Sequence, residues 1–377
     1  MQQSYMKVII LCGSLEPGHC GIGDYSRRLA NELARLGHNV GLIALNDKFL
    51  EDEEDGLKGT HEGIEIPTLR LPHTLEASER FNRAKSWIGH FDPQWLSFQC
   101  ELFAFHPKGL PFGLGKSLAD LGKSNCWHIM FHELWLGLEK EASNKILLWG
   151  LVQKMLIKSI LSRLNPRVVH THVQLYQEVL KTISTKSTIL PLISNIAVPE
   201  KRKEYPAYCE KNSITFVIFG TMYYGSPIET FAKEFGLLSH KKGIKAKLIS
   251  IGRNRKTSNR WIAACNEGGI EVELMGEQSP ETVSDVLFRS TYGITTTPYV
   301  LTAKSGTVIA MLEHGLPVVC IARPYHYGKF DFHKTLPGIT EYIPGNLEQC
   351  LLNRRRVNLS AHTISAVSHQ FVQSLSI

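Results

Sequence analysis

The sequence predicts an α/β protein with two domains, each a mostly parallel sheet covered by helices on both faces. Short apolar runs typical of buried strands alternate with segments of helical periodicity along the chain. The alternation is interrupted once, by 195–213, which holds two prolines and the charged run Glu200–Glu204. The length of 377 residues also fits two domains.

The elements of the first domain follow in order. The apolar run Val8–Cys12 predicts the first strand, and Tyr25–Leu36 predicts a helix that ends at the favourable C-cap Gly37. Further apolar runs predict strands at Asn39–Leu45, Trp95–Gln99, Trp127–Phe131, Val168–His170 and Thr188–Leu192.

The second domain repeats this rhythm, and helical periodicity at 359–377 predicts a last helix. We expect an N-terminal domain at 1–198, a C-terminal domain at 199–345 and C-terminal helices at 346–377. The predicted strands of the second series are Phe216–Gly220, Lys247–Ile251, Ile270–Leu274, Gly293–Thr297 and Pro317–Ile321.

Composition limits the function classes. Hydrophobic residues make up 43% of the chain and the formal net charge is +7, so anionic ligands are permitted, but no long basic run interleaved with aromatics supports nucleic-acid binding. No two of the eight cysteines have C-x-x-C spacing, which favours reduced thiols and a cytoplasmic protein. The apolar run near the N-terminus is too short for a signal sequence or a spanning helix.

The apolar segment Asn144–Leu164 predicts a long helix carrying four cations. At about 100° per residue, Lys154 and Lys158 lie nearly opposite Lys145 and Arg163, so the cations do not gather on one face. We therefore expect a largely buried helix with long cationic side chains reaching water. Peripheral contact with the inner face of a membrane stays open as an alternative.

A ligand site is predicted where 295–319 passes from strand to helix. Lys304, Ser305, Gly306 and Thr307 open that helix, whose first turn has unpaired N–H groups and the positive end of the helix dipole. Gly306 allows close approach to the backbone and Lys304 adds positive charge, as a diphosphate would require. The alternative is that Ser305 or Thr307 only caps a structural helix.

The loop after the first strand is rich in glycine. Gly18, Gly21 and Gly23 precede the first helix, but their order is not that of the dinucleotide fingerprint, and we find no clean acidic end to the second strand. We favour ligand contact by Gly21 and Gly23, the alternative being a sharp connection capped by Asp24.

Other candidates follow predicted strands. His132 could exchange a proton near neutral pH or be a structural histidine, and Gln99 and Glu101 could bind sugar hydroxyls. His170 and His172 lack an evident third ligand, so we expect no metal site. In the second half, Gly220 and Thr221 end one strand, while Arg253 and Arg255 could bind phosphate or simply be solvated.

Taken together, these segments resemble the GT-B glycosyltransferases, specifically their large retaining class called family 4. The resemblance covers nearly the whole chain and rests on the glycine loop and first helix, His132–Trp135, and a set of later segments: Leu190–Asn195, Met275–Glu277, Gly293–Pro298 and Gly315–Val319. It departs at Thr302 and Ala310, which stand where the class usually has two glutamates. It also departs after the first strand of the second domain, where 220–225 lacks the usual Arg and Lys.

The resemblance implies two Rossmann-like domains facing a cleft, with a nucleotide sugar, UDP- or GDP-linked, as substrate and neither metal nor cofactor. Glycines 21 and 23 would approach the donor from one side. Donor contacts from the other would come from Gly220, Thr221, Arg253, Lys304, Ser305, Gly306 and Thr307.

The resemblance further implies that His132 and Lys304 are catalytic and that Asp24, Gln99 and Glu101 bind the acceptor. We expect sugar transfer to a glycan, a lipid-linked or a small-molecule acceptor. The alternatives are a non-catalytic nucleotide-sugar or glycan binding protein and a nucleotide-sugar epimerase. A nicotinamide oxidoreductase is disfavoured because the dinucleotide fingerprint is absent.

Overall fold

The computed structural model describes residues 5–59, 64–199, 212–253, 258–327, 336–352, 357 and 359–376. The chain divides into two compact units. The first contains 1–191, 326–330 and 364–377, and the second contains 192–325 and 331–363. The division therefore falls a few residues before the boundary expected at 198. The charged run of the expected linker lies outside the described residues.

The first unit is built on a sheet that orders its described strands as β3-β4-β2-β1-β5-β6-β7-β8, all parallel except the pair β3–β4. Its strands are β1 (Lys7–Cys12), β2 (Asn39–Asp47), β3 (Glu54–Gly59), β4 (Glu65–Pro72), β5 (Trp95–Cys100), β6 (Cys126–Phe131), β7 (Val168–Thr171) and β8 (Thr188–Ile189).

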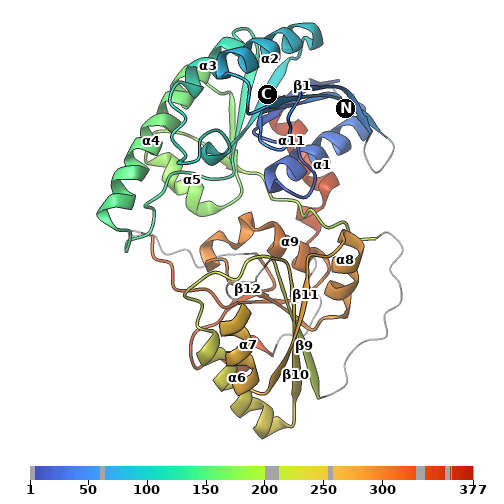
Figure 1. The fold of residues 1–377 in the computed structure, drawn as a ribbon, viewed down its shortest axis with the longest axis vertical. Helices are drawn as coiled ribbons and strands as arrows, with labels where there is room; N and C mark the ends of the chain where they lie inside the picture. Colours follow the sequence, from blue (N-terminus) through green and yellow to red (C-terminus); the bar gives the residue numbers. More distant parts are fainter. Residues whose placement is uncertain are drawn as a thin grey trace. The chain divides into compact units, whose positions relative to one another are not determined.

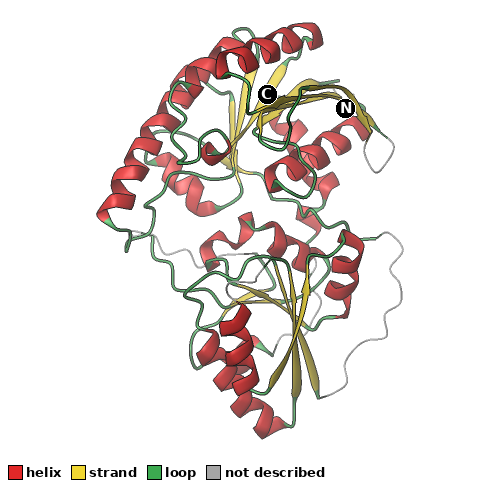
Figure 2. Cartoon of the chain, in the orientation of Figure 1, coloured by secondary structure: helices red, strands yellow, loops and turns green. Residues whose placement is uncertain are grey.

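Helices cover both faces of this sheet (Figure 2). One face carries α1 and α11, which lie side by side in Figure 1, and the other carries α2, α3 and α4. The helical elements are α1 (Gly21–Arg35), α2 (Ala77–Phe91), η1 (Leu102–Ala104), α3 (Leu114–Leu121), α4 (Asn144–Leu164), α5 (Gln174–Lys181) and α11 (Ile364–Leu375).

The second unit has a parallel sheet whose described strands run β11-β10-β9-β12-β13-β14. These are β9 (Ser213–Phe219), β10 (Lys245–Ile251), β11 (Ile270–Gly276), β12 (Tyr292–Thr295), β13 (Val318–Cys320) and β14 (Ile339–Glu341). The helical elements are α6 (Ile228–Lys242), α7 (Ser258–Glu267), α8 (Pro280–Arg289), η2 (Tyr299–Lys304), α9 (Gly306–Glu313), α10 (Leu347–Cys350) and η3 (Ser360–His362).

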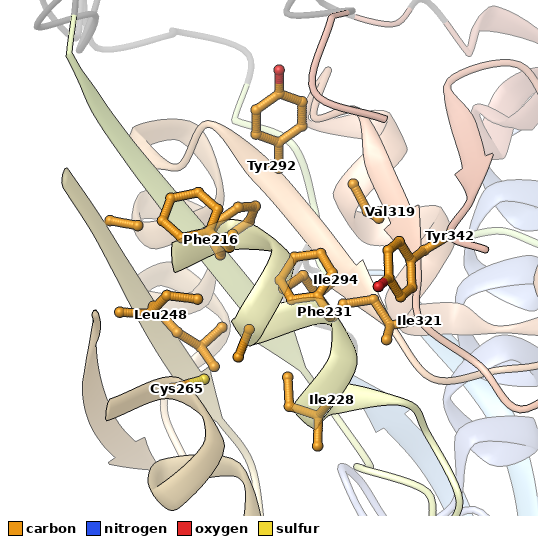
Figure 3. Packing of buried hydrophobic residues seen from close by; sticks show 14 of the residues in the cluster. Phe216, Ile228, Phe231, Leu248, Cys265, Tyr292, Ile294, Val319, Ile321 and Tyr342 are labelled. Carbon is orange, nitrogen blue, oxygen red and sulfur yellow. The ribbon is translucent and has the colours of Figure 1, made fainter. Parts of the chain in front are cut away.

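Aromatic side chains fill the core between the second sheet and α6 (Figure 3). Phe216 of β9 meets Phe231 of α6 edge to face, with ring centroids 5.8 Å apart, and Phe231 meets Tyr342 in the same way at 5.2 Å. All three side chains are buried. Aromatic burial of this kind dominates core energetics, which explains why the sheet holds this helix firmly.

The predicted fold class is confirmed, and the predicted strands are found. Three strands escaped prediction. Glu54–Gly59 is polar and glycine-rich, as is common for an edge strand. Prolines interrupt the apolar pattern of Glu65–Pro72, and Ile339–Glu341 is very short.

The expectation of a largely buried α4 is wrong for its first half. Leu148, Leu151 and Met155 are 66%, 54% and 64% exposed. The helix instead buries a narrow face that begins at Gly150 and Gln153. Among the described residues, no helix has the length and apolar character needed to cross a membrane.

Candidate functional site

In each unit, the predicted site residues gather where the strand order reverses. In the first sheet the chain runs from β1 outward through β2 and then returns to the other side of β1 with β5. In the second sheet β9 and β12 flank the corresponding reversal. Open α/β sheets bind ligands outside the carboxyl ends of strands at such points. The geometry therefore favours one candidate site in each unit.

The glycine loop of the first unit is held by backbone packing. A Cβ atom on Gly23 would lie 2.4 Å from the Ser14 carbonyl oxygen, whereas one on Gly21 would meet nothing within 4 Å. Cys20 is the N-cap of α1, and its sulfur accepts the Gly23 N–H at 3.4 Å. Capping by Asp24 is thus wrong: this carboxylate accepts the Gly18 N–H and pairs with Arg27.

We expect Gly23→Ala and Gly21→Ala to differ sharply in stability. The methyl group added by Gly23→Ala would overlap backbone that cannot move aside, so the free energy of unfolding should fall by about 2 kcal/mol or more. Gly21→Ala should change it by less than about 1 kcal/mol. Urea unfolding of both variants measures the difference. Equal stability of the two would contradict the packing role of Gly23.

His132 lies at the carboxyl end of β6 in a buried chain of hydrogen bonds. Its Nε2 lies 2.8 Å from Gln99 Oε1, and its Nδ1 lies 3.2 Å from Nε2 of His172, whose Nδ1 donates to the Leu190 carbonyl at 2.9 Å. Gln99 Nε2 donates in turn to Ser97 Oγ at 2.9 Å. His132, Gln99 and His172 are 7%, 1% and 3% exposed, so these bonds orient the rings within the protein interior.

The hydrogen bonds of this chain limit how protons can be placed on the rings of His132 and His172. The nitrogens facing Leu190 O and Gln99 Oε1 must both donate, and the two nitrogens between the rings share a further proton. With the amide placed this way, the pair holds one proton more than two neutral rings. Turning the Gln99 amide round satisfies the same bonds with both rings neutral. The state of the pair is therefore linked to the orientation of Gln99.

The other arm of the chain is uncharged. Ser97 Oγ lies 2.8 Å from His128 Nδ1, and His128 Nε2 lies 3.0 Å from His170 Nδ1. Burial, with His170 and His132 nearby, holds the pKa of His128 well below its ordinary value, and burial lowers the pKa of His170 to about 4. Both rings are neutral at pH 7, as expected for structural histidines. Phe371 of α11 covers His128 edge to face at 5.1 Å.

Two carboxylates lie beside this chain. Burial raises the pKa of Glu101, and the charge of Glu133 raises it further. Glu101 also accepts the Phe103 N–H at 2.9 Å, and Tyr176 donates to Glu133 at 2.6 Å. A carboxyl group with a raised pKa at the end of β5 is suited to accept a proton.

Asp47 corrects the expectation of no acidic end to the second strand. It ends β2, is 0% exposed, and accepts from Arg70 Nε at 2.9 Å, Ser14 Oγ at 2.8 Å and Leu15 N at 3.1 Å. Burial alone would raise the pKa of Asp47. The hydrogen bonds from Arg70, Leu15 and Ser14, together with the positive charge of Arg70, instead hold this pKa below its ordinary value. Since Arg70 comes from the unpredicted strand β4, no local pattern indicated this anchor for the glycine loop.

The candidate site of the second unit contains a cluster of hydroxyl groups. Thr296 Oγ1 donates to the Thr221 carbonyl at 2.9 Å, which ties the loops after β9 and β12 together. Ser305 Oγ lies 3.1 Å from Thr307 Oγ1, and a Cβ atom on Gly220 would lie 2.8 Å from Thr307 Cγ2. Gly220, Thr221, Ser305 and Thr307 therefore lie close together at this end of the second sheet.

The start of α9 is open to a ligand. Ser305 holds the N-cap position, but its side chain makes no capping bond in the described structure. A Cβ atom on Gly306 would meet nothing within 4 Å, and Lys304 ends the preceding turn of η2. The first N–H groups and the positive end of the helix dipole are thus available to an anion.

Arg253 is an exposed residue at the end of β10, where it pairs with Glu277. This contact is the arrangement expected of a solvated surface arginine. Residues 254–256, which include Arg255, lie outside the described residues.

Within the described ranges, no three His, Cys, Asp or Glu side chains lie close enough together to hold a metal ion. A cavity of about 510 Å³ is lined by residues from 119–127 and 163–167. It lies at the amino ends of β6 and β7, whereas the site residues follow the carboxyl ends. The candidate sites therefore rest on hydrogen bonding and helix geometry and not on this cavity.

Sequence reasoning missed three members of the candidate site in the first unit: His172, Ser97 and Tyr25. The buried Tyr25 ring meets His132 and His172 edge to face, at 5.2 and 5.6 Å. The only available signal was the His170–His172 spacing on β7. That spacing indicated two rings on one side of a strand, but their partners on β6 and β5 depend on strand order.

Comparison with known proteins finds likeness in structure alone. No protein-family model matches the chain, and no curated protein sequence matches it. A glycosyltransferase from Rickettsia africae matches with a TM-score of 0.58 and 12% identity, over 98% of this chain and 93% of its own. Anabaena HepE in complex with UDP and glucose gives 0.56 and 14%, over 98% and 95%.

A Listeria monocytogenes protein assigned as a UDP-N-acetylglucosamine 2-epimerase gives a TM-score of 0.55 and 10% identity, over 98% of this chain and 96% of its own. At such identities the likeness shows the fold. The chain has the GT-B fold, with two Rossmann-like α/β units.

Proposed function

We propose that the protein is a glycosyltransferase that moves a hexose from a nucleotide sugar to a glycan, a lipid-linked or a small-molecule acceptor in the cytoplasm. The uncapped start of α9, with Lys304 before it and Gly306 open, is the observation that carries the proposal. UDP is the first nucleotide to test, because HepE shares the fold and was solved with UDP and glucose. Retention of the anomeric configuration is the expectation for the family 4 class.

The second unit would bind the donor diphosphate. The N–H groups of Gly306 and Thr307 and the Lys304 ammonium would stabilise the charge of the departing nucleotide without a metal. Thr302 and Ala310 are fully buried, so glutamate at either position would place a carboxylate inside this core. The contacts to the sugar and ribose must then come from other residues, among which we name Gly220, Thr221 and Arg253.

The first unit would orient the sugar or the acceptor. His132 is the member of the buried chain that follows the end of β6, and Gln99 acts through it, because both ends of the Gln99 amide are bonded within the chain. Glu101, with its raised pKa, is the group best suited to receive the acceptor proton. Asp24 would contribute by holding the glycine loop through Gly18.

Lys304→Ala is expected to reduce the rate of donor turnover by about tenfold or more, because charge on the leaving diphosphate is then less stabilised. The measurement is release of UDP from UDP-hexoses, with candidate acceptors present. Lys245→Ala is the matched control. Lys245 is exposed at the amino end of β10, whereas the site residues follow the carboxyl ends of the strands. Its loss should therefore change the rate less than about twofold. An unchanged rate for Lys304→Ala would remove this lysine from the mechanism.

An epimerase is the second candidate, because the Listeria protein assigned to that activity has the same fold. Such an enzyme would convert the donor into an isomer with no acceptor present. A protein that binds nucleotide and turns over no donor would instead be a non-catalytic binding subunit. Product analysis after incubation with UDP-hexoses alone, beside a thermal-shift screen of nucleotide diphosphates, separates the three.

A further inference from the structure

The first half of α4 presents an apolar face that no described part of its own unit covers. Leu148, Leu151 and Met155 recur at helical spacing and are each more than half exposed. Leu147, beside them, is 46% exposed. Soluble domains seldom leave so many large apolar side chains together on one helix face, and such faces mark interaction sites.

The orientation of α4 is fixed by its buried face. A Cβ atom on Gly150 would lie 1.9 Å from the Leu136 carbonyl oxygen, so only glycine permits this contact. Gln153 Oε1 accepts the Leu136 N–H at 2.9 Å, and Trp149 Nε1 donates to the Lys108 carbonyl at 2.8 Å. Rotating the helix to bury its leucines would break all three contacts, so the apolar face is held outward.

Positive charge borders this face on both sides. At about 100° per residue, Lys154 and Lys158 lie on one flank, and Lys145 and Arg163 lie on the other. Asn144–Leu164 contains no Asp or Glu. Lys154 Nζ lies 5.3 Å from the centre of the Trp135 ring, which places an aromatic side chain at the same border.

We infer that this face of α4, Leu147–Met155 with its flanking lysines, docks on an anionic lipid bilayer. The leucines and Met155 would enter the boundary between headgroups and acyl chains, while the lysines bind lipid phosphates. A second copy of the chain fits less well, because it would bring the same cations against this cationic border. The inference does not depend on the proposed function.

The test is flotation of the full-length protein with vesicles of phosphatidylcholine alone or mixed with phosphatidylglycerol, without nucleotide. The wild-type protein should bind the anionic vesicles, and less so at high salt. Combined Leu148→Gln, Leu151→Gln and Met155→Gln substitutions, which keep good helix formers, should weaken binding at least about tenfold. Lys154→Gln with Lys158→Gln should weaken binding to the anionic vesicles only.

Leu237→Gln is the matched control, since Leu237 is 69% exposed on α6 of the second unit. It should bind as the wild type does, and thermal unfolding should show that the triple variant remains folded. Wild-type protein that stays with the unbound fraction would overturn the inference. A triple variant that binds the anionic vesicles as the wild type does would also overturn it. The same holds if the triple substitution only abolishes a concentration-dependent dimer, because the face would then bind a second copy of the chain.

Discussion

Replacing His132 by alanine is expected to lower the turnover of a nucleotide-sugar donor by about 100-fold or more, with UDP binding little changed. The ring is the point where the buried chain reaches the end of β6, and a positioned histidine that exchanges or holds a proton contributes about 10²–10⁴-fold to rate. The measurement is kcat and KM for donor turnover, together with UDP affinity by calorimetry.

The control for this experiment is His170→Asn. His170 belongs to the other arm of the same buried chain, so its replacement should cost a similar amount of stability. It lies within the sheet, before the strand end, and should leave kcat within about threefold of the wild type. If both variants lose activity in proportion to their stability, His132 is a structural histidine and has no part in the reaction.

Asp47→Asn is expected to lower the free energy of unfolding by about 3 kcal/mol or more at pH 7. Removing one partner of a buried ion pair is strongly destabilising, and Asp47 is fully buried beside Arg70, whose other partners, Glu16 and Glu54, are more exposed. The loop after β1 should loosen as well, because Ser14 and Leu15 both bond this carboxylate. Glu54→Gln, which removes a half-exposed partner of the same arginine, should cost less than about 1 kcal/mol.

The pH dependence provides a second measurement of the same pair. The folded chain lowers the pKa of Asp47, so the contribution of Asp47 to stability is present above the unfolded pKa of about 4. That contribution is lost as the pH falls through the still lower folded pKa. Urea unfolding from pH 7 to pH 3 should therefore show a shallower acid decline in Asp47→Asn than in the wild type. Parallel declines in the two proteins would contradict this role.

The strand order could not be read from the sequence, but most strands could. Apolar runs such as Val8–Cys12 and Phe216–Gly220 predicted buried parallel strands because burial on both faces requires continuous apolar sequence. β4 was missed because Pro67 and Arg70 interrupt its pattern. Arg70 is tolerated there because Asp47, Glu16 and Glu54 pair with it, and these are tertiary contacts.

The candidate site was predicted in the same uneven way. Local signals placed His132, Gln99, Ser305 and Gly306 at the ends of strands or the start of a helix, where the structure has them. The link between His132 and His172 depends on two strands meeting in register across the sheet, which no local pattern encodes. The exposed leucines of α4 were misjudged because apolar content alone does not tell which face of a helix meets the core.

Because α11 belongs to the first unit, that unit cannot be completed until α11 has been synthesised. Phe371 covers His128, and Gln370 donates to the carbonyl of Ile189 at 2.8 Å, so α11 packs on a sheet whose first strand begins at Lys7. During synthesis the ribosome releases the second unit before α11 emerges. The part of the first sheet that α11 covers therefore stays without this helix until residues 364–375 have been translated. A chaperone that shields this face of the nascent chain would protect it during that interval.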